Sequence, residues 1–220
     1  KVSMQCAGGI AVTVVDERMS RSVLLEAPNA QAAVEALKGI NERRDEVALQ
    51  IRGKSRFTEF KDLHSQLIGN LIFLRLEVGT GDAAGHNMAT VAAERLLGWI
   101  LECYPSLRYV SISANFCTDK KVSAVNGILG RGRSTIAEMV IPESLCQELL
   151  RTAPSALVDL HIKKNLLGSI AAGGIRTANA HVANVLLGFY LATGQDAANL
   201  VEGSQAIVHT ELRDGALYFS

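Results

Sequence analysis

Runs of β-branched and apolar residues predict short strands at intervals along the N-terminal half of the chain. We expect these strands at residues 10–15, 22–26, 57–67, 71–78 and 108–113. The charged residues at 16–18 predict a turn between the first two runs.

Helices are expected between these strands. Asn29 is a suitable N-cap for the first helix, because its side chain can accept from the free N–H groups of the first turn. The residues expected on the apolar side of this helix are Ala32, Val34, Ala36 and Leu37. A further helical turn or two is expected at residues 46–51, and a long helix follows the glycines of residues 79–82 until Pro105 ends it.

The order from residue 22 to residue 113 is therefore β-α-β-β-α-β, which is the ferredoxin-like order. A coincidence of local propensities is the alternative reading. The C-terminal half differs: it predicts a strand at 133–141, helices at 142–153, 155–164 and 179–193, and a hairpin formed by 206–212 and 216–219.

Composition and charge exclude several classes of protein. The chain has 220 residues, of which 48% are hydrophobic, and its 22 Lys and Arg balance 22 Asp and Glu. It is too apolar for a disordered tail, and it lacks the basic surplus that a non-specific nucleic-acid binder needs. No apolar run is long enough for a membrane helix, and no signal peptide is recognisable.

The cysteines and the two ends of the sequence suggest where the chain works. The four cysteines show no C-x-x-C spacing and are expected to be reduced, which favours a cytoplasmic location or a cytosol-facing domain of an anchored protein. The start at Lys1 and the apolar run at 216–220 lead us to expect a piece of a longer chain, or a partner that completes the structure.

Three groups of residues could carry chemistry. The glycine-rich segment 79–85 joins a strand to a helix and suits a phosphate, although its G-x-G-x-x-x-G spacing is not the dinucleotide fingerprint and an ordinary helix start is the alternative. In the loop 113–121, a lysine held by a carboxylate could stabilise negative charge on a carbonyl oxygen, and a solvated surface loop is the alternative.

The third group lies on the expected C-terminal helix and just after it. His181 and Asn184 share a helix face, and Asp196 lies just past the helix end, where the dipole disfavours a carboxylate unless a cation pairs with it. The alternative for each residue taken alone is an ordinary structural role, either as a cap on the surface or, for the histidine, as a hydrogen-bonded residue of the core. The five histidines show no metal-ligand spacing, so no metal is expected.

Five strings of the sequence, taken in order, resemble one enzyme family. NFCTDKK at 115–121, followed by AVN at 124–126, is similar to a signature of 3-hydroxy-3-methylglutaryl-CoA (HMG-CoA) reductase. GDAAGHNM at 81–88 resembles a second signature, and the strings at 164–166, 179–184 and 194–198 keep the family's order and spacing. The Asp-Lys-Lys form resembles class I, which includes the eukaryotic and archaeal enzymes.

The resemblance implies reduction of HMG-CoA to mevalonate and CoA, in two hydride transfers from NADPH, on the route to isoprenoids and sterols. It implies a homodimer or higher homo-oligomer with active sites between subunits. It also implies an α+β fold, in which a small ferredoxin-like NADP-binding domain at 22–113 is inserted in a larger mixed α/β substrate domain formed by 1–21 and 114–220, with the catalytic loop at 114–121.

Residue roles follow by position from the resemblance. Lys120 resembles the catalytic lysine and Asp196 the aspartate that hydrogen-bonds it. The residues expected around the HMG group are Arg21, Ser113, Asn115, Asp119 and Lys121, and those expected to line the substrate and CoA site are Lys164, His181 and Asn184. The residues expected to bind NADPH are Ser55, Arg56, Phe57, Asp82, Ala83, Ala84, Gly85, His86, Asn87 and Met88, with Arg56 near the 2′-phosphate.

The sequence also departs from the family pattern. Ala84 and His86 stand where Met is common, and Ser22 stands where Gly is common. The family's catalytic glutamate is expected before Lys1, and the histidine that protonates the CoA thiolate is expected after Ser220. The alternative function is therefore an incomplete reductase or relic that binds a nucleotide or CoA ligand without turnover. An RNA-binding sheet is disfavoured, because the strand at 108–113 offers only Tyr109 as an aromatic.

Overall fold

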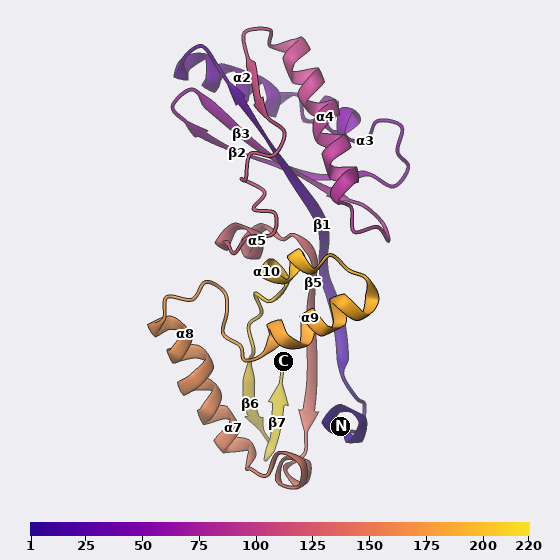
Figure 1. Cartoon of the computed structure of the whole chain (residues 1–220), viewed down its shortest axis with the longest axis vertical. Coiled ribbons are helices and arrows are strands. Elements are labelled where there is room, and N and C mark those ends of the chain that lie inside the picture. The colour runs from indigo at the N-terminus through magenta and orange to yellow at the C-terminus, as the bar shows by residue number, and fades with distance from the viewer. The chain divides into compact units, whose positions relative to one another are not determined.

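The computed structural model describes residues 1–220 as a mixed α/β chain with seven strands (Figure 1). The contacts divide the chain into two units. We call residues 17–119 and 129–133 the central unit, and residues 1–16, 120–128 and 134–220 the flanking unit. None of the helices combines the length and apolar content that a membrane span requires.

Four antiparallel strands form the sheet of the central unit, in the order β4-β1-β3-β2. Their bounds are β1 (Ala11–Glu26), of which the central unit holds the part from Glu17, β2 (Glu59–Ile68), β3 (Leu71–Gly79) and β4 (Arg108–Ser111). The helices are α2 (Ala30–Glu42), α3 (Arg44–Arg52) and α4 (His86–Cys103).

Strand β3 places apolar side chains on one face of this sheet because successive residues point to opposite sides. Every second residue from Ile72 to Val78 is fully buried in the main core. Helices α2 and α4 both pack on β3, and α3 packs on β2 and α4. The main hydrophobic core of the chain therefore belongs to the central unit.

The alternate residues of β3 carry buried charges. Arg75 and Glu77 are fully buried, with Arg75 Nε 2.8 Å from Glu77 Oε1. Arg18 of β1 adds a second cation, with Nη1 2.5 Å from Glu77 Oε2, and Arg75 Nη2 donates to the carbonyl of Gly130 at 2.7 Å. Buried charges are tolerated in a folded protein when each one has a close partner, and every charged group of this network has one.

The flanking unit has a much smaller core, formed by Cys6, Ile141, Cys146 and Leu217. Strand β7 pairs antiparallel with β5 on one side and with β6 on the other, and α7 packs on β6 and β7. The strands are β5 (Gly132–Ile141), which begins in the central unit, β6 (Thr210–Arg213) and β7 (Ala216–Phe219).

The helical segments of the flanking unit are mostly short. They are α1 (Val2–Gln5), α5 (Ala124–Leu129), whose last residue belongs to the central unit, α6 (Glu143–Leu145), the π-helix η1 (Cys146–Leu150), α7 (Pro154–Leu160), the π-helix η2 (His161–Leu167), α8 (Gly168–Ala171), α9 (Val182–Thr193), the 3-10 helix η3 (Ala197–Asn199) and α10 (Leu200–Gly203).

The expected turn at residues 16–18 is wrong, because β1 runs without interruption from Ala11 to Glu26. Its charged residues have partners outside the strand. Arg18 pairs with Glu77 of β3, and Glu17 pairs with Arg133 of β5, whose Nε lies 3.0 Å from Glu17 Oε2. Glu17 and Arg18 therefore form ion pairs with other strands, and residues 16–18 do not form a turn.

The first helix begins where the sequence indicated, but its apolar side is different. Asn29 Oδ1 accepts from the Ala32 backbone N–H at 2.9 Å, which confirms the N-cap. The buried residues are Ala33, Ala36 and Ile40, whereas Val34 is exposed. The prediction that Val34 lies on the apolar side is therefore wrong.

Two helices of the flanking unit also differ from expectation. The segment expected as one helix at 142–153 contains a single turn and a π-helix that ends at Leu150, and Arg151 has a left-handed φ of 57°. The helix expected at 155–164 continues through a π-helical stretch to Ala171. Periodicity does not reveal the extra residue that a π-helical turn accommodates.

Candidate active site

The loop at 114–121 has an unusual backbone. Asn115, Thr118 and Lys120 have positive φ values of 59°, 47° and 56°, a region that side-chain-bearing residues rarely adopt. Residues held there cost on the order of 1–3 kcal/mol each, and such strain concentrates at functional sites when the surroundings maintain it.

Contacts within the central unit hold the first part of this loop. Ser22 accepts twice: its carbonyl from the Ala114 N–H at 3.2 Å, and its Oγ from the Cys117 N–H at 3.1 Å. Cys117 is buried, and the ring of Phe116 meets Phe73 edge-on with centroids 6.3 Å apart. The side chain of Ser22 therefore anchors the loop.

Lys120 and Asp196 form an ion pair in the flanking unit, with Nζ 2.5 Å from Oδ2. The other carboxylate oxygen of Asp196 accepts from the Ala198 N–H at 3.0 Å, as the N-cap of η3. The lysine side chain is 36% exposed and the aspartate side chain 47% exposed. The pair can therefore be reached from solvent, as a group that meets a substrate must be.

Asp119 lies beside two arginines and a histidine of the central unit. Its Oδ1 is 2.5 Å from Arg131 Nη2, its Oδ2 is 3.8 Å from Arg21 Nη1, and His86 Nε2 approaches Oδ1 at 3.9 Å. The sequence named Asp119, Arg21 and His86 but not Arg131. The structure therefore adds a buried arginine that no motif indicated.

The other expected substrate residues are more dispersed. Ser113 and Asn115 are exposed in the loop. Lys164, His181 and Asn184 are exposed in the flanking unit, and their side chains take part in no hydrogen bond or ion pair there. His181 has a φ of 62° and is the N-cap residue of α9. The chain thus leaves the polar groups of these three residues available.

A buried histidine lies in the π-helical segment that carries Lys164. His161 is 5% exposed, and its Nδ1 lies 3.1 Å from the Nδ2 amide of Asn165. If the amide donates, Nδ1 is the acceptor and the ring proton is on Nε2. Burial lowers the pKa of His161, and the nearby His209 lowers it further.

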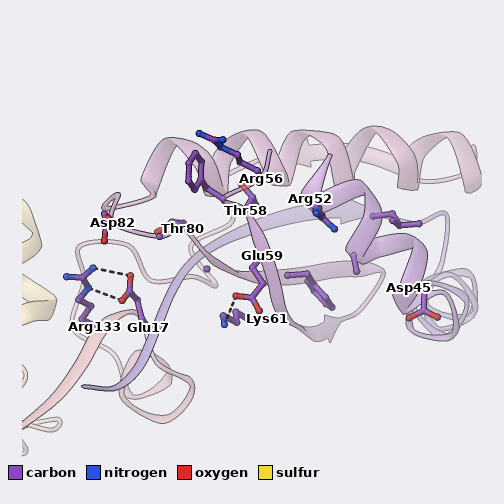
Figure 2. Close-up of a pocket in the computed structure, with 16 residues that line it drawn as sticks. Glu17, Asp45, Arg52, Arg56, Thr58, Glu59, Lys61, Thr80, Asp82 and Arg133 are labelled. Carbon is purple, nitrogen blue, oxygen red and sulfur yellow. Dashed lines mark hydrogen bonds and ion pairs between the residues drawn. The ribbon is translucent and has the colours of Figure 1, made fainter. Parts of the chain in front are cut away.

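The central unit contains a cavity of about 970 Å³ (Figure 2). Arg52 and Asp45 reach it from α3, Arg56 and Phe57 from the loop before β2, and the segment 79–82 from the end of β3. Two of its cations are neutralised within the chain: Arg133 pairs with Glu17, and Lys61 Nζ lies 2.7 Å from Glu59 Oε2. The carboxylate of Glu17 raises the pKa of Arg133 above its usual value.

Arg52 and Arg56 are the cavity cations without an ion pair inside the chain. The guanidinium of Arg56 lies over the ring of Phe57, 4.7 Å from its centroid. Ser55 does not line the cavity, but its Oγ accepts from the Phe57 and Thr58 N–H groups at 3.3 and 3.1 Å and so shapes the turn. The cavity therefore has two uncommitted guanidiniums and an aromatic face.

The residues expected from the second signature divide into two sets. Asp82 lines the cavity, whereas residues 83–88 do not. Gly85 has a φ of +83° as the N-cap of α4, and a Cβ there would lie 2.5 Å from Thr80 Cγ2, so only glycine fits. Sequence reasoning missed Arg52, Lys61 and Arg133, because isolated charges far apart along the chain give no motif.

A family model described as hydroxymethylglutaryl-coenzyme A reductase matches residues 2–220. The chain belongs to this family. It is 42% identical over 218 residues to 3-hydroxy-3-methylglutaryl-coenzyme A reductase of Pyrococcus horikoshii, which covers 97% of this chain and 52% of that protein. It is 39% identical over 223 residues to the reductase of Strongylocentrotus purpuratus, covering 99% of the chain and 24% of that protein.

The fold agrees with this membership. A solved structure of the class II reductase of Streptococcus pneumoniae, bound to NADPH in open conformations, aligns with a TM-score of 0.69 at 17% identity, over 99% of this chain and 60% of that chain. At such identity the likeness concerns the fold. The chain spans about half the length of the archaeal family members it matches.

The buried His161 leads to a pH prediction. Its folded-state pKa is lowered, so between that pKa and the ordinary value of about 6.5 the unfolded chain binds a proton that the folded chain does not. The free energy of unfolding should therefore fall as pH falls through about 6.5. His161→Gln should flatten this dependence in urea titrations between pH 8 and pH 5. The exposed His181→Gln is the control, and an equal slope for wild type and His161→Gln would contradict the prediction.

Proposed function

We propose that the protein reduces HMG-CoA to mevalonate and CoA with NADPH, as a class I reductase of the mevalonate route to isoprenoids. The observation that carries the proposal is the 2.5 Å pair of Lys120 and Asp196, formed by two motifs that lie far apart in the sequence. Family membership over residues 2–220 supports the same reaction. A cytosolic location belongs to the proposal, and the four free thiols are what a reducing compartment predicts.

Lys120 has the chemistry that reduction of a thioester carbonyl requires. NADPH, when bound, supplies the hydride. As the carbonyl carbon gains that hydride, negative charge grows on the oxygen, and the Lys120 ammonium stabilises it. The Asp196 carboxylate holds the ammonium in place through the ion pair. The first hydride gives a hemithioacetal, whose C–S bond then breaks, and CoA leaves as the thiol after its sulfur takes up a proton. The aldehyde that remains accepts the second hydride beside the same pair, and its oxygen takes up a proton to become the hydroxyl of mevalonate.

The other residues proposed to bind the substrate are assigned roles by the charge and hydrogen-bonding groups of their side chains. Arg21, 14% exposed, and Lys121 supply cations for the substrate carboxylate, while Ser113 and Asn115 supply hydrogen-bonding groups. In the flanking unit, Lys164, His181 and Asn184 have uncommitted polar groups for the CoA portion.

The cavity of the central unit fits a phosphorylated dinucleotide. Arg52 and Arg56 are uncommitted guanidiniums, which bind phosphate in a charge-assisted and often bidentate manner. Phe57 offers an aromatic face, and Gly79 and Gly81 line the cavity with little side-chain bulk. Asp82 to Met88 and Ser55 complete the proposed cofactor-binding set, with Ser55 acting through the turn that it shapes.

We propose further that the central unit is a ferredoxin-like cofactor domain, with boundaries near 22 and 113, inserted in a larger substrate domain. Its β-α-β-β-α-β order, with α3 as an added helix, and its antiparallel strand order β4-β1-β3-β2 support this assignment. The inserted position agrees with the division of the chain, because the flanking unit contains residues from both sides of the central unit.

The flanking unit also supports assembly into at least a homodimer. No residue of α9 is buried, although most of the helix is apolar. Val185 and Phe189, one turn apart, are 74% and 58% exposed. Exposed apolar patches of this kind mark interaction sites. We propose a second copy of the chain as the partner.

The role of Lys120 can be tested by substitution in the natural full-length protein. Lys120→Ala should lower kcat for HMG-CoA reduction by about 10²–10³, the usual cost of losing one oxyanion donor, and Asp196→Asn should be similarly severe. NADPH oxidation measured with HMG-CoA is the assay. Lys163→Ala, which removes an exposed ion pair with Asp159, is the matched control. Near-wild-type turnover of Lys120→Ala would refute the assignment, and a wild type that binds NADPH without turnover would favour a relic.

Arg56 should select the cofactor. Arg56→Ala is expected to weaken NADPH binding much more than NADH binding, because only NADPH carries the 2′-phosphate. Calorimetric titration of both cofactors measures the difference. Lys54→Ala removes an exposed cation two residues away that does not line the cavity, and it should change neither affinity. An equal loss for NADPH and NADH would place Arg56 elsewhere.

Assembly can be tested by light scattering. The wild type should be at least a dimer, and Phe189→Glu should lower its mass toward that of a monomer, because it puts a charge in the middle of the proposed apolar interface. Glu148→Lys, on the exposed surface of η1, controls for a change of charge. A monodisperse wild-type monomer would overturn the assembly proposal.

A further inference from the structure

Arg131 is a buried cation just before β5. Its side chain is only 2% exposed, and Nη2 lies 2.5 Å from Asp119 Oδ1. Nη1 lies 3.1 Å from the sulfur of Met19 on β1. A guanidinium removed from water needs a close anionic partner, and Asp119 supplies it.

The two arginines beside Asp119 are not equivalent. Arg131 is within hydrogen-bond distance of one oxygen, whereas Arg21 Nη1 remains 3.8 Å from the other. Arg21 therefore keeps donor capacity for another anion, because the carboxylate beside it is held by Arg131.

The same carboxylate lies between two strained backbone positions. Thr118 and Lys120, directly before and after Asp119, have φ values of 47° and 56°. Strained residues persist only where the surroundings fix them. The Arg131 contact acts on the residue between these two, and thus on the peptide unit that leads to Lys120.

We propose that Arg131 is a positioning residue for the reduction, an inference that rests on the proposed function. It anchors Asp119, which fixes the backbone that presents Lys120. It also occupies the Asp119 carboxylate, which leaves Arg21 available for the substrate carboxylate. When Arg131 is lost, Asp119 pairs with Arg21, so both substrate binding and the placement of Lys120 suffer.

The test uses Arg131→Gln in the natural full-length protein. KM for HMG-CoA should rise about tenfold, as expected for loss of one charge-assisted contact, and kcat should fall by about 10² from misplacement of Lys120. KM for NADPH should stay within about twofold, because Arg131 does not line the cavity. Arg44→Gln, which breaks the 2.8 Å pair of Arg44 with Asp62 in the same unit, should leave all three constants near wild type.

A second variant and a second measurement keep the proposal testable if Arg131→Gln does not fold. Arg131→Lys keeps the charge but cannot reproduce both contacts, so its KM for HMG-CoA should rise less than in Arg131→Gln and remain above wild type. Amide hydrogen exchange of residues 114–121, measured without substrate, should be faster in both Arg131 variants and unchanged in Arg44→Gln.

Each outcome decides between the hypotheses. An unchanged KM for HMG-CoA together with unchanged exchange of residues 114–121 in Arg131→Lys overturns the positioning role. A uniform loss, in which KM for NADPH rises as much as KM for HMG-CoA, indicates general destabilisation and also overturns it. A wild type that does not reduce HMG-CoA refutes the proposed function, whereas the exchange measurement still reports whether Arg131 anchors the loop.

Discussion

The pairing of Lys120 with Asp196 is the constraint on which the candidate site depends. A lysine with a left-handed backbone is conformationally unfavourable. Asp196 follows the C-terminal end of α9 and is fixed locally as the N-cap of η3, and its other carboxylate oxygen pairs with the Lys120 ammonium. The ion pair with this fixed carboxylate therefore offsets part of the cost of the strained lysine.

The loop that presents Lys120 has a second fixed point at the preceding residue. Asp119 is held in the central unit by Arg131, while Lys120 is held in the flanking unit by Asp196. The division between the two units falls at the peptide bond that joins these residues. Side chains that are neighbours in the sequence thus have partners in different units of the fold.

Local patterns in the sequence predicted most elements of the central unit, because alternation along β3 and the N-cap at Asn29 depend on neighbouring residues. The same patterns failed at residues 16–18, where the partners of the charged side chains are remote in sequence. In the flanking unit few side chains are buried, so the spacing of apolar residues along the sequence is a poor guide to its helices, and π-helical turns shift that spacing.

For the site, the motifs predicted that Lys120 and Asp196 would meet. Arg131 and Arg52 could not be found, since only the folded chain gives them their surroundings.

The buried Arg75 and Glu77 have a consequence for the register of the central sheet. In the observed pairing, Arg75 lies opposite Ser22 and Glu77 opposite Ser20, while Ile72 to Val78 alternate with them on the side of the helices. A slip of β3 by one residue would turn both charges toward that apolar side and away from Arg18 and Gly130. Buried charges without partners are far more costly than the loss of a few strand hydrogen bonds. The network therefore excludes neighbouring registers, and Gly79 and Gly81, at the end of β3 and just after it, line the cavity at a single position along the sheet.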